Sequence, residues 1–134
     1  MEKTLVLIKP DGVRRNIIGK IISMYEEQEL VIEKLKRVTP TLPQVHALYK
    51  DHKDQSFYPG LVESMMSGDI VAMVVAGEYA IGSVRNINGA TNPDKATPGT
   101  IRALYGEELP YNTVHASDSE EAYQRELAIW FPEE

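Results

Sequence analysis

Apolar residues along this chain follow two periodicities, and four short stretches favour β-strands. Residues 4–8 and 70–76 are almost wholly apolar and β-prone, which is typical of buried strands. Residues 31–38 are also β-leaning, although lysines interrupt their apolar positions. A short β-prone stretch ends at His115. We therefore expect four strands, of which the third is the most hydrophobic.

Helical spacing and loop signals occupy the remaining sequence. The predicted helices span residues 17–29, 42–49, 58–66, 78–87 and 120–131. Residues 9–12 contain a proline and a glycine and should form a turn directly after the first strand. Residues 88–99 are rich in Gly, Asn, Pro and Thr and should form a loop, and loops of that length are often functional.

The order of these elements predicts the fold class. Strands and helices succeed one another without an internal repeat, a linker or a low-complexity tract, and 134 residues suffice for one domain with a single core. We therefore expect residues 1–134 to form one α/β sandwich, in which helices cover a small, mainly antiparallel, four-stranded sheet.

Composition and charge narrow the classes of function. The chain has no cysteine, which removes thiolate nucleophiles and zinc-cysteine sites and weakly favours the cytoplasm. The N-terminus enters a strand directly, without a signal-peptide pattern, so a soluble, unexported protein is expected. A net charge of -6 argues against membrane or nonspecific nucleic-acid binding. An anionic substrate would need a locally positive pocket.

His115 and Glu126 are the strongest candidates for chemistry. Glu126 lies within the apolar arc of the last predicted helix, whose start Ser117 or Ser119 could cap. A buried carboxylate needs a partner, and the ring of His115 is near in sequence. Accepting a hydrogen bond from one ring nitrogen would leave the other as a nucleophile. Alternatively, His115 is an ordinary polar or core residue and Glu126 pairs with a nearby Arg or Lys.

Several cationic and aromatic residues stand beside turns or loops, where side chains can converge on a ligand. The cationic candidates for holding phosphate are Lys9, Arg14, Arg15, Arg85 and Arg102. The alternative for each of them is a solvated surface charge. Phe57 or Tyr58 could stack on a base or pack in the core, whereas His46 and His52 lack metal-ligand spacing and are expected on the surface.

The common nucleotide-binding motifs are absent. The segment from Gly12 to Lys20 resembles a Walker loop, but six residues instead of four separate its glycines, and Ile21 replaces the required hydroxyl. No Gly-x-Gly-x-x-Gly occurs, which excludes a Rossmann fingerprint. Any phosphate must therefore be held in another way.

Taken together, motifs along essentially the whole chain resemble the nucleoside diphosphate kinase family. The segments that carry the resemblance are Lys9-Pro10-Asp11-Gly12-Val13, Tyr49, Arg85, Thr91-Asn92-Pro93, Pro98-Gly99-Thr100-Ile101-Arg102 and Asn112 to Ser119. The resemblance implies a ferredoxin-like α/β sandwich. It also implies ping-pong transfer of a terminal phosphate from a nucleoside triphosphate to a nucleoside diphosphate through phosphorylated His115.

The same resemblance implies roles for individual residues. Glu126 matches the acid that orients the histidine, and Ser117 matches a residue contacting that acid. Asp118 matches a residue linked through water to Mg²⁺, which is held mainly by the nucleotide phosphates. The residues that match phosphate and ribose ligands are Lys9, Tyr49, Arg85, Thr91, Arg102 and Asn112, and those that match the base-flanking pair are Phe57 and Leu109.

Four positions depart from the family pattern without removing a catalytic group: Ser56, Ala103, Leu109 and Ala116. Because size and polarity change little, we expect effects of at most about 1 to 2 kcal/mol. Asn112 and His115 would face opposite sides of a regular strand. The strand must therefore begin after Asn112.

Two other functions stay open on the sequence alone: a nucleotide-binding scaffold without turnover, and a phosphohistidine carrier that serves a protein acceptor. The family resemblance also implies a homo-oligomer, for which we favour a hexamer over a tetramer.

Overall fold

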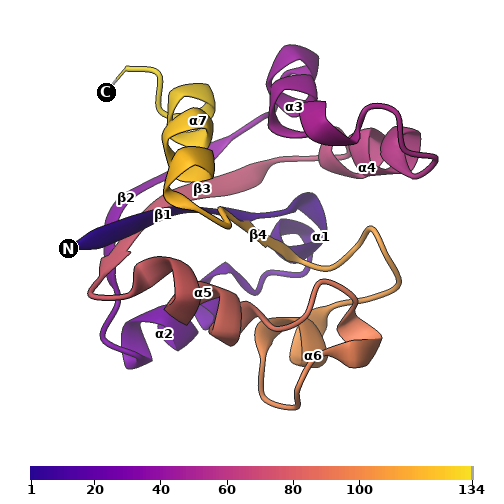
Figure 1. The fold of residues 1–134 in the computed structure, drawn as a ribbon. Helices are drawn as coiled ribbons and strands as arrows, with labels where there is room; N and C mark the ends of the chain where they lie inside the picture. The colour runs from indigo at the N-terminus through magenta and orange to yellow at the C-terminus, as the bar shows by residue number, and fades with distance from the viewer. Residues whose placement is uncertain (134) are drawn as a thin grey trace.

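The computed structural model describes residues 1–133 (Figure 1). Its elements in chain order are β1 (Glu2–Ile8), α1 (Pro10–Arg14), α2 (Ile18–Glu27), β2 (Val31–Val38), α3 (Leu42–Leu48), η1 (Lys50–His52), α4 (Tyr58–Met65), β3 (Ile70–Gly77), α5 (Ala80–Asn88), η2 (Pro93–Lys95), α6 (Ile101–Tyr105), β4 (Val114–Ala116) and α7 (Glu120–Trp130).

The four strands form one sheet in the order β2-β3-β1-β4, and each pairing is antiparallel. Leu5 of β1 lies opposite Val74 of β3, while Leu7 lies opposite His115 of β4. The predicted four-stranded α/β sandwich is therefore confirmed, and its histidine sits on an edge strand beside the central strand β1.

Both faces of the central strands are covered, which explains why β1 and β3 read as continuous apolar runs. Leu5 and Leu7 of β1 face α3, α4 and α7, whereas Val6 and Ile8 face α2, α5 and α6. Figure 1 shows these two groups of helices on opposite sides of the sheet. The two cores therefore hold the central strands in place, and the strands position the loops that follow them.

Four short helices, α1, η1, η2 and α6, were not predicted. The turn expected at residues 9–12 is the start of α1, where Pro10 occupies the first helical position and its fixed φ suits a helix. The long loop contains η2 and leads into α6, which Thr100 caps by accepting a hydrogen bond from the amide of Ala103. None of these helices exceeds five residues, so apolar periodicity cannot reveal them.

The segment that follows β1 and the segment that precedes β4 are hydrogen-bonded to each other, and together they form the floor of a cleft. Thr113 is buried with a φ of 76°, and its carbonyl accepts a 2.8 Å hydrogen bond from the amide of Lys9. This left-handed residue interrupts the alternation of side chains, so β4 begins after Asn112, as predicted. Asn112 and His115 can therefore line the same cleft.

Candidate active site

A cleft of about 970 Å³ opens where β1 ends and β4 begins, between the α3–α4 segment and the chain around α6. Its size lies at the upper end of the usual range for small-molecule sites. The predicted site residues among its lining are Lys9, Tyr49, Phe57, Arg85, Thr91, Arg102, Leu109, Asn112, His115, Asp118 and Glu126. Ser117 adjoins them through Glu126.

His115 and Glu126 meet as predicted. The Nε2 atom of His115 lies 2.8 Å from Oε1 of Glu126, and the same oxygen accepts a 2.9 Å hydrogen bond from Oγ of Ser117. Glu126 is only 3 % exposed, because its position on α7 faces the sheet. The carboxylate thus engages one ring nitrogen and leaves Nδ1 as the nitrogen available for attack.

A chain of polar contacts runs from Lys9 across the cleft floor. The Nζ atom of Lys9 donates hydrogen bonds to the carbonyl of Pro110 at 2.7 Å and to Oδ1 of Asn112 at 2.9 Å. Nδ2 of Asn112 in turn donates to the carbonyl of Thr91 at 2.9 Å. These contacts join the end of β1 to the segments before α6 and β4 and hold three predicted phosphate ligands together.

Burial destabilises the charge of Lys9. The residue is 3 % exposed, and this desolvation lowers its pKa to about 8, while Asp11 opposes the shift and Arg102 adds to it. An ammonium group in this state is weakly hydrated and poorly neutralised. It gains more from an incoming phosphate than an exposed lysine would.

Arg102 is also preorganised. Its two terminal nitrogens donate to the carbonyls of Gly89 at 2.7 Å and Val114 at 2.8 Å, and burial lowers its pKa. Gly89 has a φ of 88°, and a Cβ there would lie 2.5 Å from Oγ1 of Thr100. Glycine is therefore required where the loop meets the arginine. Arg85 lines the same cleft from α5 and is exposed.

Aromatic rings form the wall opposite the loop. Tyr49 is buried, its pKa is raised by desolvation, and its ring meets that of His115 edge-on at 6.4 Å. Phe57 is 54 % exposed and Leu109 47 % exposed, and both line the cleft. Apolar side chains left open at a cleft mouth suit a planar ligand such as a base.

Several candidates lie elsewhere. Arg14 donates to Oγ of Ser67 at 2.9 Å, and Arg15 donates to the carbonyl of Tyr105, so the structure does not bring either arginine into the cleft. Both were wrong as phosphate-binding candidates, because α1 turns them away from the end of β1. Tyr58 packs against the core beside α3 and its hydroxyl contacts His46, which leaves Phe57 as the available ring.

Four charged or titratable residues line the cleft although the sequence had assigned them no role in a site: Asp51, His52, Glu121 and Arg125. His52 is exposed, as predicted, yet its ring lies 5.7 Å from that of Phe57. Their nearness in sequence to predicted site residues was the only indication of this position, because Asp51 and His52 follow Tyr49 closely and Arg125 precedes Glu126. Only the fold shows which of these neighbours turn inward.

Comparison with known proteins now decides the family. The family model for nucleoside diphosphate kinase matches residues 2–134. The chain belongs to this family. It is therefore an enzyme, a nucleotide-binding kinase of the transferase class.

Curated relatives and a solved structure agree with this assignment. The nucleoside diphosphate kinase of Caldanaerobacter subterraneus subsp. tengcongensis is 47 % identical over 133 residues, covering 99 % of this chain and 96 % of the relative. That of Sulfurisphaera tokodaii is 47 % identical over 134 residues, covering 100 % and 91 %. An apo crystal structure of the enzyme from Encephalitozoon cuniculi is 38 % identical, with a TM-score of 0.95, covering 97 % of this chain and 88 % of that one. The expected ferredoxin-like fold is confirmed.

The four departures from the family pattern fall where the fold accepts them. Ala116 is buried within β4 opposite Val6, and Ala103 occupies an exposed position of α6, where alanine favours a helix over glycine. Ser56 and Leu109 are exposed at the cleft mouth.

Within residues 1–133, no helix has the length and apolar character needed to cross a bilayer.

Proposed function

We propose that this chain, acting as one domain over residues 1–134, moves the terminal phosphate of a nucleoside triphosphate, typically ATP, to a nucleoside diphosphate by a ping-pong mechanism. The observation that carries the proposal is the contact of 2.8 Å between His115 and the buried Glu126. That contact orients the ring and stabilises the charge it gains on forming a bond to phosphorus.

The reaction divides into two balanced transfers. Nδ1 of His115 forms a bond to the terminal phosphorus while the bond from phosphorus to the bridging oxygen breaks, and the nucleoside diphosphate leaves. A terminal oxygen of a second diphosphate then attacks the phosphohistidine and restores the free ring. Because charge spreads over the equatorial oxygens, positioned cations supply much of the rate, and Lys9, Arg85 and Arg102 are assigned this role.

The remaining contacts are assigned by position. Tyr49, Thr91 and Asn112 hold phosphate and ribose oxygens, and Ser117 fixes Glu126. Phe57 and Leu109 flank the base, and because they offer apolar contact with little hydrogen-bond readout, broad tolerance of bases follows.

The residues present fit a Mg²⁺ ion that is held mainly by the substrate. Residues 1–133 contain no cluster of three or more His, Cys, Asp and Glu side chains able to hold a metal. Asp118 is exposed at the cleft rim, where it can contact the ion through water. Mg²⁺ commonly keeps several waters and binds substrate phosphates with only one or two carboxylates. When bound, the ion would neutralise charge on the phosphates.

Phosphoenzyme formation tests the proposal. Incubation with ATP labelled in the terminal phosphate should give an acid-labile, alkali-stable phosphoprotein that passes its label to GDP. His115→Ala should abolish labelling, because the variant lacks the nitrogen that accepts the phosphate.

The matched control is His46→Ala, which removes an exposed histidine on α3 outside the cleft and should label normally. Normal labelling of His115→Ala would refute the mechanism. A wild-type protein that binds ATP without labelling would favour a scaffold, and transfer to proteins in a cell extract but not to GDP would favour a phosphohistidine carrier.

We further propose a cytoplasmic role in maintaining nucleoside triphosphate pools, without a membrane or specific nucleic-acid partner. A homo-oligomer, with a hexamer favoured over a tetramer, is supported by β2. Among residues 1–133 this strand pairs on one side only, with β3, and it leaves Val31 and Leu35 half exposed. An unpaired strand edge with apolar side chains favours association.

A further inference from the structure

The two oxygens of the Glu126 carboxylate have different partners. Oε1 lies 2.8 Å from Nε2 of His115 and accepts from Oγ of Ser117 at 2.9 Å. Oε2 lies 3.6 Å from Nη2 of Arg125. One oxygen therefore holds the histidine, and the other faces a guanidinium group that the proposed mechanism leaves without a role.

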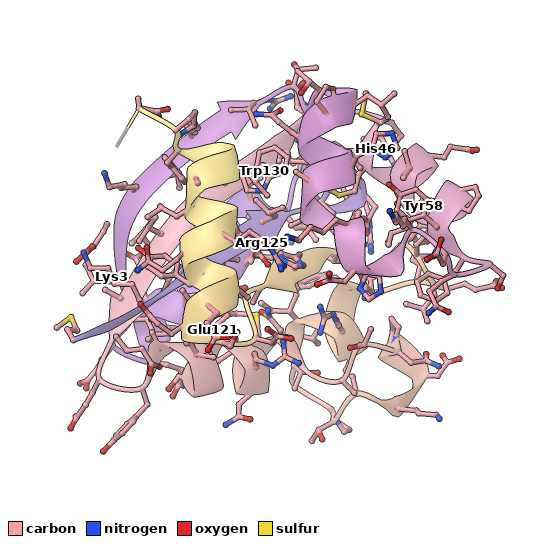
Figure 2. All side chains as sticks on the ribbon, turned by 45° about the horizontal axis from the view of Figure 1, so that its top comes forward. Lys3, His46, Tyr58, Glu121, Arg125 and Trp130 are labelled. Carbon is pink, nitrogen blue, oxygen red and sulfur yellow. The ribbon has the colours of Figure 1, made fainter. Side chains whose placement is uncertain are left out.

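Arg125 is itself fixed from the opposite wall of the cleft. Its Nη1 lies 3.4 Å from Oδ2 of Asp51 on η1. The side chain is about one-third exposed, although its Nε is buried and without a hydrogen-bond partner among residues 1–133. Figure 2 shows Arg125 projecting from α7 toward the α3 side of the cleft, well away from Glu121 at the start of the helix. The guanidinium thus lies between an exposed and a buried carboxylate.

Two other cations of the cleft have hydrogen-bond partners elsewhere. Lys9 donates to Pro110 and Asn112, and Arg102 donates to Gly89 and Val114. Arg125 is the guanidinium that the structure pairs with Glu126 among the described residues.

Further ionisable groups line the cleft around His115. From α5 there is Arg85, from the α3–η1 segment Tyr49 and His52, and from the segment leading into α7 and its first turn Asp118 and Glu121. None of these has an ion pair with Glu126 in the part of the chain described, residues 1–133.

We propose that Arg125 is a positioning residue that tethers Oε2 of Glu126 and offsets its charge, so that His115 keeps its orientation and its neutral, nucleophilic form. The inference deepens the proposed function and rests on His115 being the nucleophile. A carboxylate alone stabilises the protonated ring, which cannot attack phosphorus. A guanidinium on the far oxygen reduces that effect and keeps the hydrogen bond to the ring.

The sign of the expected change follows from charge. Replacing Arg125 by a neutral residue removes a cation near the ring and leaves Glu126 uncompensated, and both changes favour the protonated imidazole. In Arg125→Gln the titration midpoint of the His115 ring, followed by NMR without nucleotide, should rise above the wild-type midpoint measured in the same way. The acidic limb of the phosphorylation rate should move to higher pH by the same amount.

Three variants separate positioning from general structure. Arg125→Lys keeps the charge and should leave the midpoint near the wild-type value. Arg37→Gln is the matched control, since it breaks an exposed arginine–aspartate pair with Asp69 outside the cleft, and should change nothing. Asp51→Asn removes only the outer anchor and should not raise the midpoint. If Arg125→Gln fails to fold, Arg125→Met, which retains the aliphatic stem, replaces it.

An unchanged midpoint in the neutral Arg125 variant would overturn the proposal. An equal rise in Asp51→Asn would overturn it as well, because it would show that Arg125 acts only by holding η1 against α7. The NMR titration uses no nucleotide. Loss of the proposed function, seen as a wild-type protein that never labels, is therefore distinguishable from failure of this inference.

Discussion

At the residue scale, Lys9 combines a proposed phosphate-binding role with a charge that burial disfavours. Its pKa is lowered to about 8 by desolvation. We expect kcat/KM to fall as pH rises through about 8, because kcat/KM reports the free enzyme and a neutral amine no longer attracts phosphate. Initial rates between pH 7 and 10 measure this limb.

The control is Lys9→Arg, whose side chain stays protonated over this range. Its kcat/KM should be lower than that of the wild type but should not fall between pH 7 and 10. A wild-type kcat/KM that stays level to pH 10 would contradict the assignment. The same shift acts on folding in a defined direction. Between about 8 and 10.5 the unfolded lysine holds a proton that the folded one has released, so the contribution of Lys9 to stability becomes more favourable as pH rises.

At the element scale, α1 positions Lys9 through a close approach between segments. A Cβ on Gly12 would lie 2.8 Å from Cγ2 of Ile8 and 3.2 Å from Cγ2 of Thr113. We expect Gly12→Ala to lower the free energy of unfolding by about 1 to 3 kcal/mol, through overpacking where β1 meets the segment before β4. Urea unfolding monitored by circular dichroism measures the change.

Gly82 provides the matched control. It is exposed within α5, and a Cβ there meets nothing within 4 Å, so Gly82→Ala should stabilise by about 0.5 to 1 kcal/mol. Equal effects of the two substitutions would show that the contact at Gly12 is relieved by movement of Ile8.

The sequence predicted the main helices and strands more completely than the orientations of the side chains around the site. The strands and long helices follow from apolar periodicity, and the burial of Glu126 follows from its place on a helix face. The inward turn of Arg125 and the outward turn of Arg14 do not follow, because each depends on how a helix is rotated against its neighbours. The left-handed Thr113 also carries no local signal, although the need for Asn112 and His115 to share a cleft required some break in the strand.

At the scale of the whole molecule, the sheet has two unequal edges. The β4 edge carries the proposed active site, and its three residues are flanked by α7 and the loop before Val114. The β2 edge is eight residues long, and Val31 and Leu35 are 50 % and 52 % exposed on it. Assembly through β2 would cover this apolar surface and leave the cleft at the other edge open to nucleotides.

We therefore expect Leu35→Glu to reduce the proposed homo-oligomer to smaller species, because association would bury a charge without a partner. Light scattering coupled to size exclusion measures the mass. Met66→Glu, at a 41 % exposed position after α4, is the control and should leave the mass unchanged. A full-sized assembly of Leu35→Glu would place the interface elsewhere. Because the cleft lies within one chain, labelling of His115 should persist in the smaller species even where its stability falls.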